Sequence, residues 1–276
     1  MMCAWKELLA MLPLRLRPEV DRLGKDSLQE LRLRVNGPPV LHLKMEQVPL
    51  QMRMTQEDVD FVVNTASRYS PWACETLRHG YLTAPGGHRI GVCGEVIVQR
   101  EGITGIRQVR SLCIRVARDF PGISGNMDKM EGNLLLLGPP GSGKTTLLRD
   151  LIRKLSVRYT VGVVDERQEL FPEGLPVGRA DVLSGCKKAI GMEMLLKTMS
   201  PEIIAVDEIT SEADRQGLVN IANCGVRLLA TAHAGSLKEF RGREIYRPLL
   251  EKELFDHIIV LDRNKTFTVE RMRVCT

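Results

Sequence analysis

Residues 134–146, which read LLLLGPPGSGKTT, decide the fold of this chain. Four apolar residues end in a glycine-rich turn, the turn closes with Lys144 and Thr145, and a helical pattern follows. The spacing from Gly138 is that of the phosphate-binding loop, G-x-x-x-x-G-K-[ST], in its required place between a strand and a helix. Few side chains stand in such a loop, so its backbone N–H groups can approach a triphosphate. The stretch therefore predicts an ATP site; a chance glycine-rich turn is the alternative.

The predicted ATP site takes in the whole loop. The helix that follows points its N-terminus, with unpaired N–H groups and partial positive charge, at the phosphates. We expect the Lys144 ammonium to reach the β- and γ-phosphates and the Thr145 hydroxyl to bind Mg²⁺. The residues expected to contact ATP are Gly138, Pro139, Pro140, Gly141, Ser142, Gly143, Lys144, Thr145 and Thr146.

Beyond the loop, apolar strands alternate with helical patterns. Strands are expected at 161–164, 203–206 and 226–231, helices at 144–155, 186–199 and 211–223, a long loop at 168–185, and a hairpin of 258–261 with 266–269. This alternation predicts an α/β domain with a mostly parallel sheet and helices on both faces. Ligands of such sheets lie at the carboxyl ends of the strands, where this sequence places Asp165-Glu166, Asp207-Glu208 and His233.

These strand ends carry the residues that phosphate chemistry needs. Asp207 can hold Mg²⁺ and Glu208 can act as general base toward water, unless both merely cap the next helix. Asp165 and Glu166 can share the metal shell or the water; the alternative, for at least one of the two, is a loop ion pair with Arg167. His233 can bond the γ-phosphate or the water, and a purely structural histidine is the alternative.

Phosphoryl transfer also calls for an extra cation that neutralises charge in the transition state. An arginine commonly supplies it, often from a neighbouring subunit. The candidates are Arg89, Arg167, Arg179 and Arg215, and the sequence does not choose among them.

The first 120 residues predict a small α+β domain without a catalytic constellation of its own. We expect short helices within 5–23, a strand at 29–35 in a hairpin with 40–44, a capped helix from Thr55 and a helical stretch at 72–78. Hairpins split at Pro85–Gly87 and at Gly91 should follow. Residues 121–132, with Pro121, Gly122 and Gly125, predict a linker to an ATPase domain at 133–276.

Composition narrows the possible classes of protein. The 276 residues are 43% hydrophobic and 26% charged, with a net charge of +5 and only 4% aromatics. Scarce aromatics argue against a stacking platform for single-stranded nucleic acid. The seven cysteines are odd in number and include no C-x-x-C pair, which favours free thiols in a reducing cytoplasm. No apolar run approaches the ~20 residues of a membrane span, and charges within residues 1–17 argue against a signal peptide.

Six stretches together resemble the stage III sporulation protein AA family. They are LRLRV at 31–35, GYLTAPGGHRIG at 80–91, Gly138–Thr146 followed by LLRD, VDER at 164–167, SPEIIAVDEI at 200–209 and ATAHA at 230–234. The likeness spans about residues 28–262. This family is similar in turn to the ATPases of type II and type IV secretion and of pilus machines.

The resemblance implies an N-terminal domain packed on a RecA-like ATPase domain, assembled as a homohexameric ring. It implies that Asp165-Glu166 is an acidic box, Asp207-Glu208 a Walker B site and His233 a histidine box. Secretion ATPases usually have one acidic residue where Asp207-Glu208 stands, and their tetracysteine metal site is absent from this sequence.

The resemblance also implies a biological setting. The protein would work in the mother cell of a spore-forming bacterium, at the cytoplasmic face of the outer forespore membrane. There it would energise a channel complex through membrane-embedded partners, with ATP and Mg²⁺ as cofactors and without nucleic acid. Two other readings are a nucleic-acid-linked ATPase, which nucleic acid would stimulate in a salt-dependent way, and a nucleotide-gated scaffold with little turnover.

Overall fold

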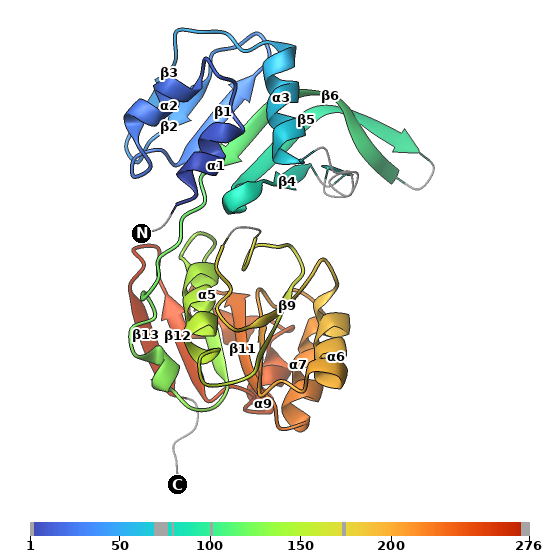
Figure 1. Cartoon of the computed structure of the whole chain (residues 1–276). Coiled ribbons are helices and arrows are strands. Elements are labelled where there is room, and N and C mark those ends of the chain that lie inside the picture. Colours follow the sequence, from blue (N-terminus) through green and yellow to red (C-terminus); the bar gives the residue numbers. More distant parts are fainter. Residues whose placement is uncertain (1–2, 69–76, 79, 100–101, 173–174, 272–276) are drawn as a thin grey trace. The chain divides into compact units, whose positions relative to one another are not determined.

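The computed structural model describes residues 3–68, 77–78, 80–99, 102–172 and 175–271 (Figure 1). The chain divides into two compact units. The N-terminal unit comprises Met1–Asp119 with Pro172–Leu175, and the C-terminal unit comprises Phe120–Phe171 with Pro176–Thr276.

The C-terminal unit is built on a seven-stranded sheet in the order β13-β12-β7-β11-β10-β8-β9. The strands are β7 (Leu134–Gly138), β8 (Val161–Asp165), β9 (Asp181–Ser184), β10 (Ile203–Val206), β11 (Arg227–His233), β12 (His257–Leu261) and β13 (Phe267–Arg271). All neighbours pair in parallel except β12 and β13, which form the expected antiparallel hairpin. The predicted α/β fold with a mostly parallel sheet is confirmed.

Helices cover both faces of this sheet. They are α5 (Lys144–Leu155), α6 (Lys188–Met199), α7 (Glu212–Asn223), α8 (Leu237–Gly242) and α9 (Arg247–Glu251), and a 3₁₀ turn, η2 (Met127–Lys129), precedes β7. Because side chains alternate along a strand, Leu135 and Leu137 join the core with α6 and α7, whereas Leu134 and Leu136 join the core with α5. A strand buried on both faces accounts for the unbroken apolar run before the glycine-rich loop.

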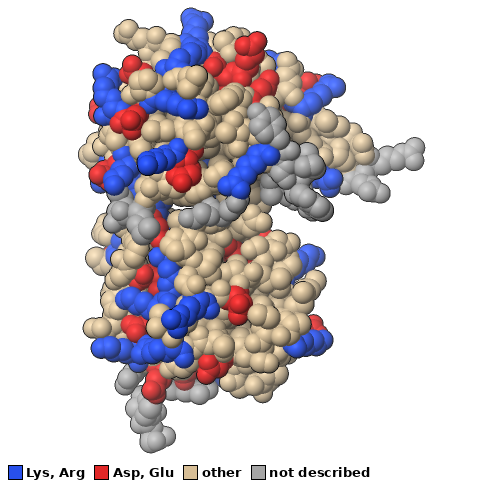
Figure 2. Space-filling model, in the orientation of Figure 1, with Lys and Arg blue, Asp and Glu red and all other residues tan. Residues whose placement is uncertain are grey.

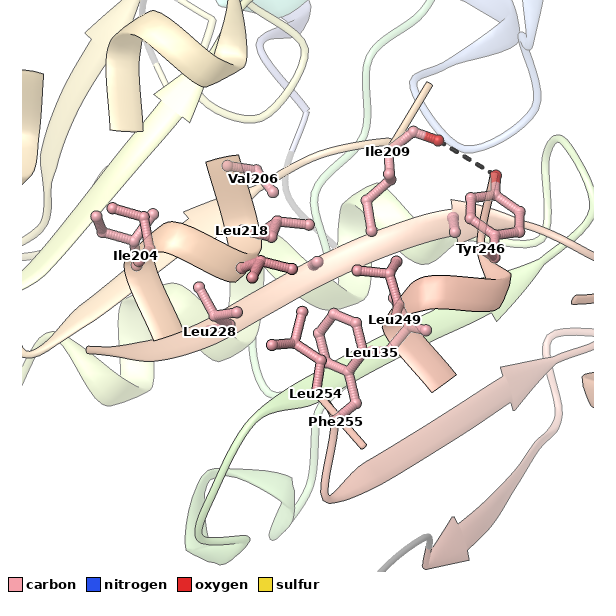
Figure 3. Packing of buried hydrophobic residues seen from close by; sticks show 14 of the residues in the cluster. Leu135, Ile204, Val206, Ile209, Leu218, Leu228, Tyr246, Leu249, Leu254 and Phe255 are labelled. Atoms are coloured by element: carbon pink, nitrogen blue, oxygen red, sulfur yellow. Dashed lines mark hydrogen bonds between the residues drawn. The ribbon is translucent and has the colours of Figure 1, made fainter. Parts of the chain in front are cut away.

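The core on the α6 and α7 side is closed by the segment that follows β11 (Figure 3). Tyr246 and Leu249 pack there with Leu135, and the Tyr246 hydroxyl donates to the carbonyl of Ile209 at 3.2 Å. Full burial of a leucine contributes about 1.5–3 kcal/mol. The bond from Tyr246 also anchors the chain two residues after Asp207, so this core supports one strand end of the candidate site.

The N-terminal unit contains a six-stranded antiparallel sheet in the order β3-β2-β1-β6-β5-β4. Its elements are α1 (Trp5–Ala10), α2 (Arg17–Leu23), β1 (Glu30–Arg34), β2 (Val40–His42), β3 (Gln47–Pro49), α3 (Gln56–Ala66), β4 (Tyr81–Thr83), η1 (Pro85–Gly87), β5 (Arg89–Gln99) and β6 (Gly102–Arg115). Thr55 and Asp58 form the capping box expected at the start of α3. The α+β character predicted for this region is confirmed.

Three expectations need correction or lie outside the described residues. Gly91 does not split a strand, because β5 runs through it and Gly91 pairs with Cys113 on β6. The loop expected at 168–185 contains β9, which adds an edge strand beside β8. The helical stretch expected at 72–78 lies outside the described residues except for 77–78.

The proline-glycine-glycine-histidine stretch of the N-terminal unit is explained by packing. A Cβ on Gly86 would lie 2.2 Å from the Cβ of Ala4, so only glycine fits there. His88 is buried, accepts from the N–H of Ala117 at Nδ1 (3.1 Å) and bonds the Ala4 carbonyl through Nε2 (2.8 Å). Burial lowers the pKa of the His88 imidazole, which favours the neutral ring that these two bonds require.

The surface carries charges of both signs. On the face shown in Figure 2, Lys and Arg as well as Asp and Glu side chains appear over both units. Such mixing fits a net charge of +5 and does not require a nucleic-acid partner. Within the described ranges, no helix combines the length and the apolar character needed to cross a bilayer.

Candidate functional site

The glycine-rich loop runs from the end of β7 to the first turn of α5. A Cβ on Gly138 would come within 2.4 Å of the Ser142 Oγ and 2.8 Å of the Leu261 carbonyl oxygen, so the tight start of the loop requires glycine. Gly143 precedes α5 with a φ of 98°, a backbone conformation that glycine adopts at little cost. Glycines at these two positions thus allow the tight loop between β7 and α5.

Lys144 is buried inside this loop. Its Nζ donates to the carbonyl oxygens of Gly138 (2.8 Å) and Pro139 (3.1 Å). Burial lowers the pKa of the Lys144 ammonium, although Asp207 and Glu208 act in the opposite direction. Ser142 Oγ is also buried and makes no hydrogen bond within the described part of the chain. An orphaned hydroxyl and an ammonium that faces only neutral partners in the loop make a cradle that an anionic ligand would complete.

Two threonine hydroxyls and one carboxylate connect the loop to the neighbouring strands. Thr145 Oγ1, at the start of α5, donates to Asp207 Oδ2 at 2.8 Å, and Thr231 Oγ1, on β11, donates to Asp207 Oδ1 at 2.6 Å. Burial raises the pKa of the Asp207 carboxyl, and the two hydroxyl bonds oppose that rise. One hydroxyl and one carboxylate are the protein ligands that Mg²⁺ commonly uses beside phosphate oxygens, so these residues fit the ion.

His233 joins the loop lysine to the residue after Asp207. Its Nδ1 lies 3.1 Å from Lys144 Nζ, and its Nε2 lies 2.5 Å from Glu208 Oε1. An ammonium can only donate, so Nδ1 accepts and Nε2 carries the proton that bonds the Glu208 carboxylate. The three side chains therefore form one chain of hydrogen bonds. Glu208 itself has a φ of 58°, which is unusual for a residue with a side chain and common at functional sites.

Asp165 and Glu166, the second acidic pair, make different contacts. The Asp165 carboxylate accepts from the backbone N–H groups of Glu169 (2.8 Å), Leu170 (3.0 Å) and Phe171 (2.8 Å) and so shapes the loop after β8. Glu166 pairs with Lys188 at the start of α6. Neither side chain forms the expected alternative ion pair with Arg167.

Of the candidate arginines, Arg167 lies at the site. Its guanidinium Nη1 is 3.7 Å from Glu208 Oε2. Arg215 pairs with Glu212 on α7, and Arg89 belongs to the N-terminal unit, where its guanidinium lies 5.0 Å from the ring centre of Tyr81. The geometry within one chain thus brings Arg167 to the acidic strand ends.

Two features of the site were not foreseen from the sequence. Lys188 lines the same pocket as Glu166, Asp207 and Glu208. A second, mostly apolar pocket opens beside the loop and is lined by Phe120, Ile123, Ser142, Gly143, Thr146, Leu147, Leu261, Lys265 and Phe267. The residues that line this pocket come from three segments of the C-terminal unit that are distant in sequence, so no local sequence pattern predicts it.

Comparisons with known proteins agree with this architecture. The family model described as "Sporulation stage III, protein AA" matches residues 5–271. Stage III sporulation protein AA of Bacillus subtilis is 36% identical over 257 residues, which cover 87% of this chain and 84% of that protein. Two solved structures share the RecA-like fold at a TM-score of 0.62. The ATPase DotB of Legionella pneumophila is 18% identical (93% of this chain, 78% of DotB), and the pilus retraction motor PilT with bound ADP is 16% identical (89% of this chain, 76% of PilT). The chain therefore belongs to the stage III sporulation protein AA family.

Proposed function

We propose that this chain hydrolyses ATP in the presence of Mg²⁺ and that hydrolysis energises a channel or secretion complex during sporulation. One observation carries the proposal: the start of α5 and the ends of β10 and β11 bring Lys144, Thr145, Asp207, Glu208 and His233 into one hydrogen-bonded network. Thr231 links its two halves, because its hydroxyl donates to Asp207 and accepts from the N–H of Glu208. Together these residues would supply a phosphate-binding cation, ligands for Mg²⁺ and a base for water, the parts that phosphoryl transfer to water requires.

Nucleotide binding would reorganise the glycine-rich loop. The Lys144 ammonium now bonds two loop carbonyls, and a triphosphate offers it a charged partner instead. Gly138, Pro139, Pro140, Gly141, Ser142, Gly143, Thr145 and Thr146 would present their backbone N–H groups (the prolines excepted) and hydroxyls to the phosphates. The apolar pocket that includes Leu147, Leu261 and Phe267 adjoins this loop and has the character of a base-binding pocket.

Glu208 is our preferred general base. With the loop empty, its carboxylate is held by the Nε2–H of His233, whose other nitrogen is held by Lys144. When Lys144 turns to a phosphate, His233 Nδ1 loses its donor and the imidazole is free to turn, which releases Glu208 for a water molecule. Thr145 and Asp207 would hold Mg²⁺, which when bound neutralises charge on the phosphate oxygens. Arg167 is the nearest candidate for an additional cation, and Glu166 is the second candidate base.

The biological part of the proposal rests on family membership and on the relatives. DotB is described as an ATPase, and PilT as a pilus retraction motor with bound ADP. By this likeness we propose a homohexamer that docks on membrane-embedded partners at the mother-cell face of the outer forespore membrane, without nucleic acid. Arg89, Arg179 and Arg215 stay candidates for a cation supplied to a neighbouring subunit.

The test of nucleotide binding is a substitution in the loop. Lys144→Ala should weaken the binding of a fluorescent ATP analogue at least about 100-fold, because a charge-assisted phosphate contact is lost, and should block sporulation. Lys197→Ala is the matched control, since Lys197 lies on the surface of α6 in an exposed pair with Glu193. Equal binding by the two variants would refute a triphosphate site at this loop.

A further inference from the structure

A buried lysine lies among the acidic strand ends, outside the residues assigned above. Lys188, the first residue of α6, is 5% exposed. Its Nζ donates to Glu166 Oε2, and Asp214 Oδ2 lies 3.9 Å away. The neighbouring Lys187, by contrast, is exposed. The sequence therefore places one of two adjacent lysines in water and the other between two carboxylates.

Stability alone does not account for Lys188. Burial disfavours an ammonium, and so does the positive end of a helix dipole, where Lys188 stands. Buried ion pairs give little net stability compared with apolar residues of similar size. A lysine kept in an unfavourable position by two carboxylates suggests a role in the chemistry of the pocket.

Lys188 contacts two carboxylates that come from different elements of the C-terminal unit. Glu166 directly follows β8. Asp214, the third residue of α7, completes the capping box with Ser211, and its Oδ2 accepts from the N–H groups of Thr210 and Ser211 at 3.0 Å each. The loop from β10 to this cap contains Asp207 and Glu208. Lys188 thus ties the end of β8 to the far end of that loop.

The pocket also needs positive charge. Among the described residues, five acidic side chains line it, those of Asp165, Glu166, Glu169, Asp207 and Glu208, against two cations, Arg167 and Lys188. Arg167 lies nearer to Glu208 and Lys188 bonds Glu166. The Glu166 side chain is 36% exposed, so without Lys188 it could turn toward water or repel a triphosphate.

We infer that Lys188 is a positioning residue that fixes the Glu166 carboxylate in the pocket of Asp207 and Glu208. This inference rests on the proposed ATP hydrolysis and adds to it a residue that acts through Glu166. Lys188 touches no substrate in this role; it sets the direction of the second carboxylate and offsets its charge.

The test is a double-mutant cycle in the full-length protein with MgATP as substrate. Lys188→Met should lower kcat about 100-fold, the scale of a misplaced catalytic group, with KM for ATP changed less than about threefold. Lys188→Arg should restore most of kcat because it keeps a cation. Lys187→Met is the matched control and should leave both constants unchanged. If Lys188→Met does not fold by circular dichroism, Lys188→Gln takes its place with the same expected result.

The cycle separates positioning from simple structural support. If Lys188 acts through Glu166, Lys188→Met/Glu166→Gln should have the kcat of Glu166→Gln alone. Additive losses, or an unchanged kcat in Lys188→Met or in Glu166→Gln, would overturn the inference while leaving the proposed function intact. Absence of hydrolysis by the unsubstituted protein would overturn both.

Discussion

The carboxyl group of Asp207 is placed for a ligand rather than for stability. Two threonine hydroxyls bond it, yet burial still raises its pKa. A carboxylate in such a place is costly to ionise until a cation arrives. The sequence predicted Asp207 as a metal ligand because it ends an apolar strand, but it could not show the two threonines, which come from α5 and β11.

Asp207→Asn should therefore stabilise the protein free of nucleotide and metal. Between the ordinary Asp pKa of about 3.9 and the raised value, the folded state binds a proton that the unfolded state lacks, so the stability contributed by Asp207 falls as pH rises through this window. Above the raised pKa the carboxylate is charged and the penalty is complete. We expect a Tm about 2–4 °C higher for Asp207→Asn at pH 7 with a chelator present, a shift typical of about 1 kcal/mol.

The same measurement at lower pH is the check on the cause. The difference in Tm between Asp207→Asn and the unsubstituted protein should shrink as the pH falls, because Asp207 then takes up its proton. Asp181→Asn, at an exposed position on β9, should leave Tm unchanged at every pH. A lower Tm for Asp207→Asn at pH 7 would show that the carboxylate stabilises the empty site.

At the scale of elements, the loop after β8 depends on one side chain. Asp165 accepts hydrogen bonds from three successive backbone N–H groups, those of Glu169, Leu170 and Phe171, and is itself 2% exposed. Buried N–H groups left without an acceptor are costly. Asp165 therefore stabilises the turn that leads out of the strand.

Asp165→Ala should lower the free energy of unfolding of the C-terminal unit by at least about 2 kcal/mol, because three N–H groups lose their acceptor. Affinity for an ATP analogue with Mg²⁺ should stay within about threefold, as measured by fluorescence titration beside chemical denaturation. Glu251→Ala, an exposed position on α9, is the control. Unchanged stability with lost affinity would instead place Asp165 in the metal shell.

The helices and strands that could be predicted from the sequence are those with a local sequence signal. The strand before Gly138 and the capping box at Thr55 were predictable because their signals are local: a run of apolar residues and a short motif. The edge strand β9 was missed because its four residues are exposed or half-buried and lie in a stretch rich in glycine and proline. The bond between Glu166 and Lys188 joins two elements 22 residues apart, and only the packing of α6 beside β8 brings them together.

At the scale of the whole molecule, assembly is the next question. The homohexamer proposed above would place Arg89, Arg179 and Arg215 where a neighbouring subunit could use one of them as the additional cation. We expect native mass spectrometry with ATP and Mg²⁺ to show a species of six times the 30.9 kDa of one chain. A monomer under all nucleotide conditions would exclude the ring and leave the site to act within one chain.

Turnover of ATP at this site is measured by the release of inorganic phosphate. The purified protein with saturating MgATP should release inorganic phosphate linearly with time. Glu208→Gln should bind the nucleotide as tightly but release phosphate at least about 100-fold more slowly, because it lacks the base. Glu166→Gln shows which carboxylate matters more. If the unsubstituted protein releases no phosphate, or if Glu208→Gln and Glu166→Gln both release it as fast as the unsubstituted protein, ATP hydrolysis by this site is contradicted. Either result would favour a nucleotide-gated scaffold.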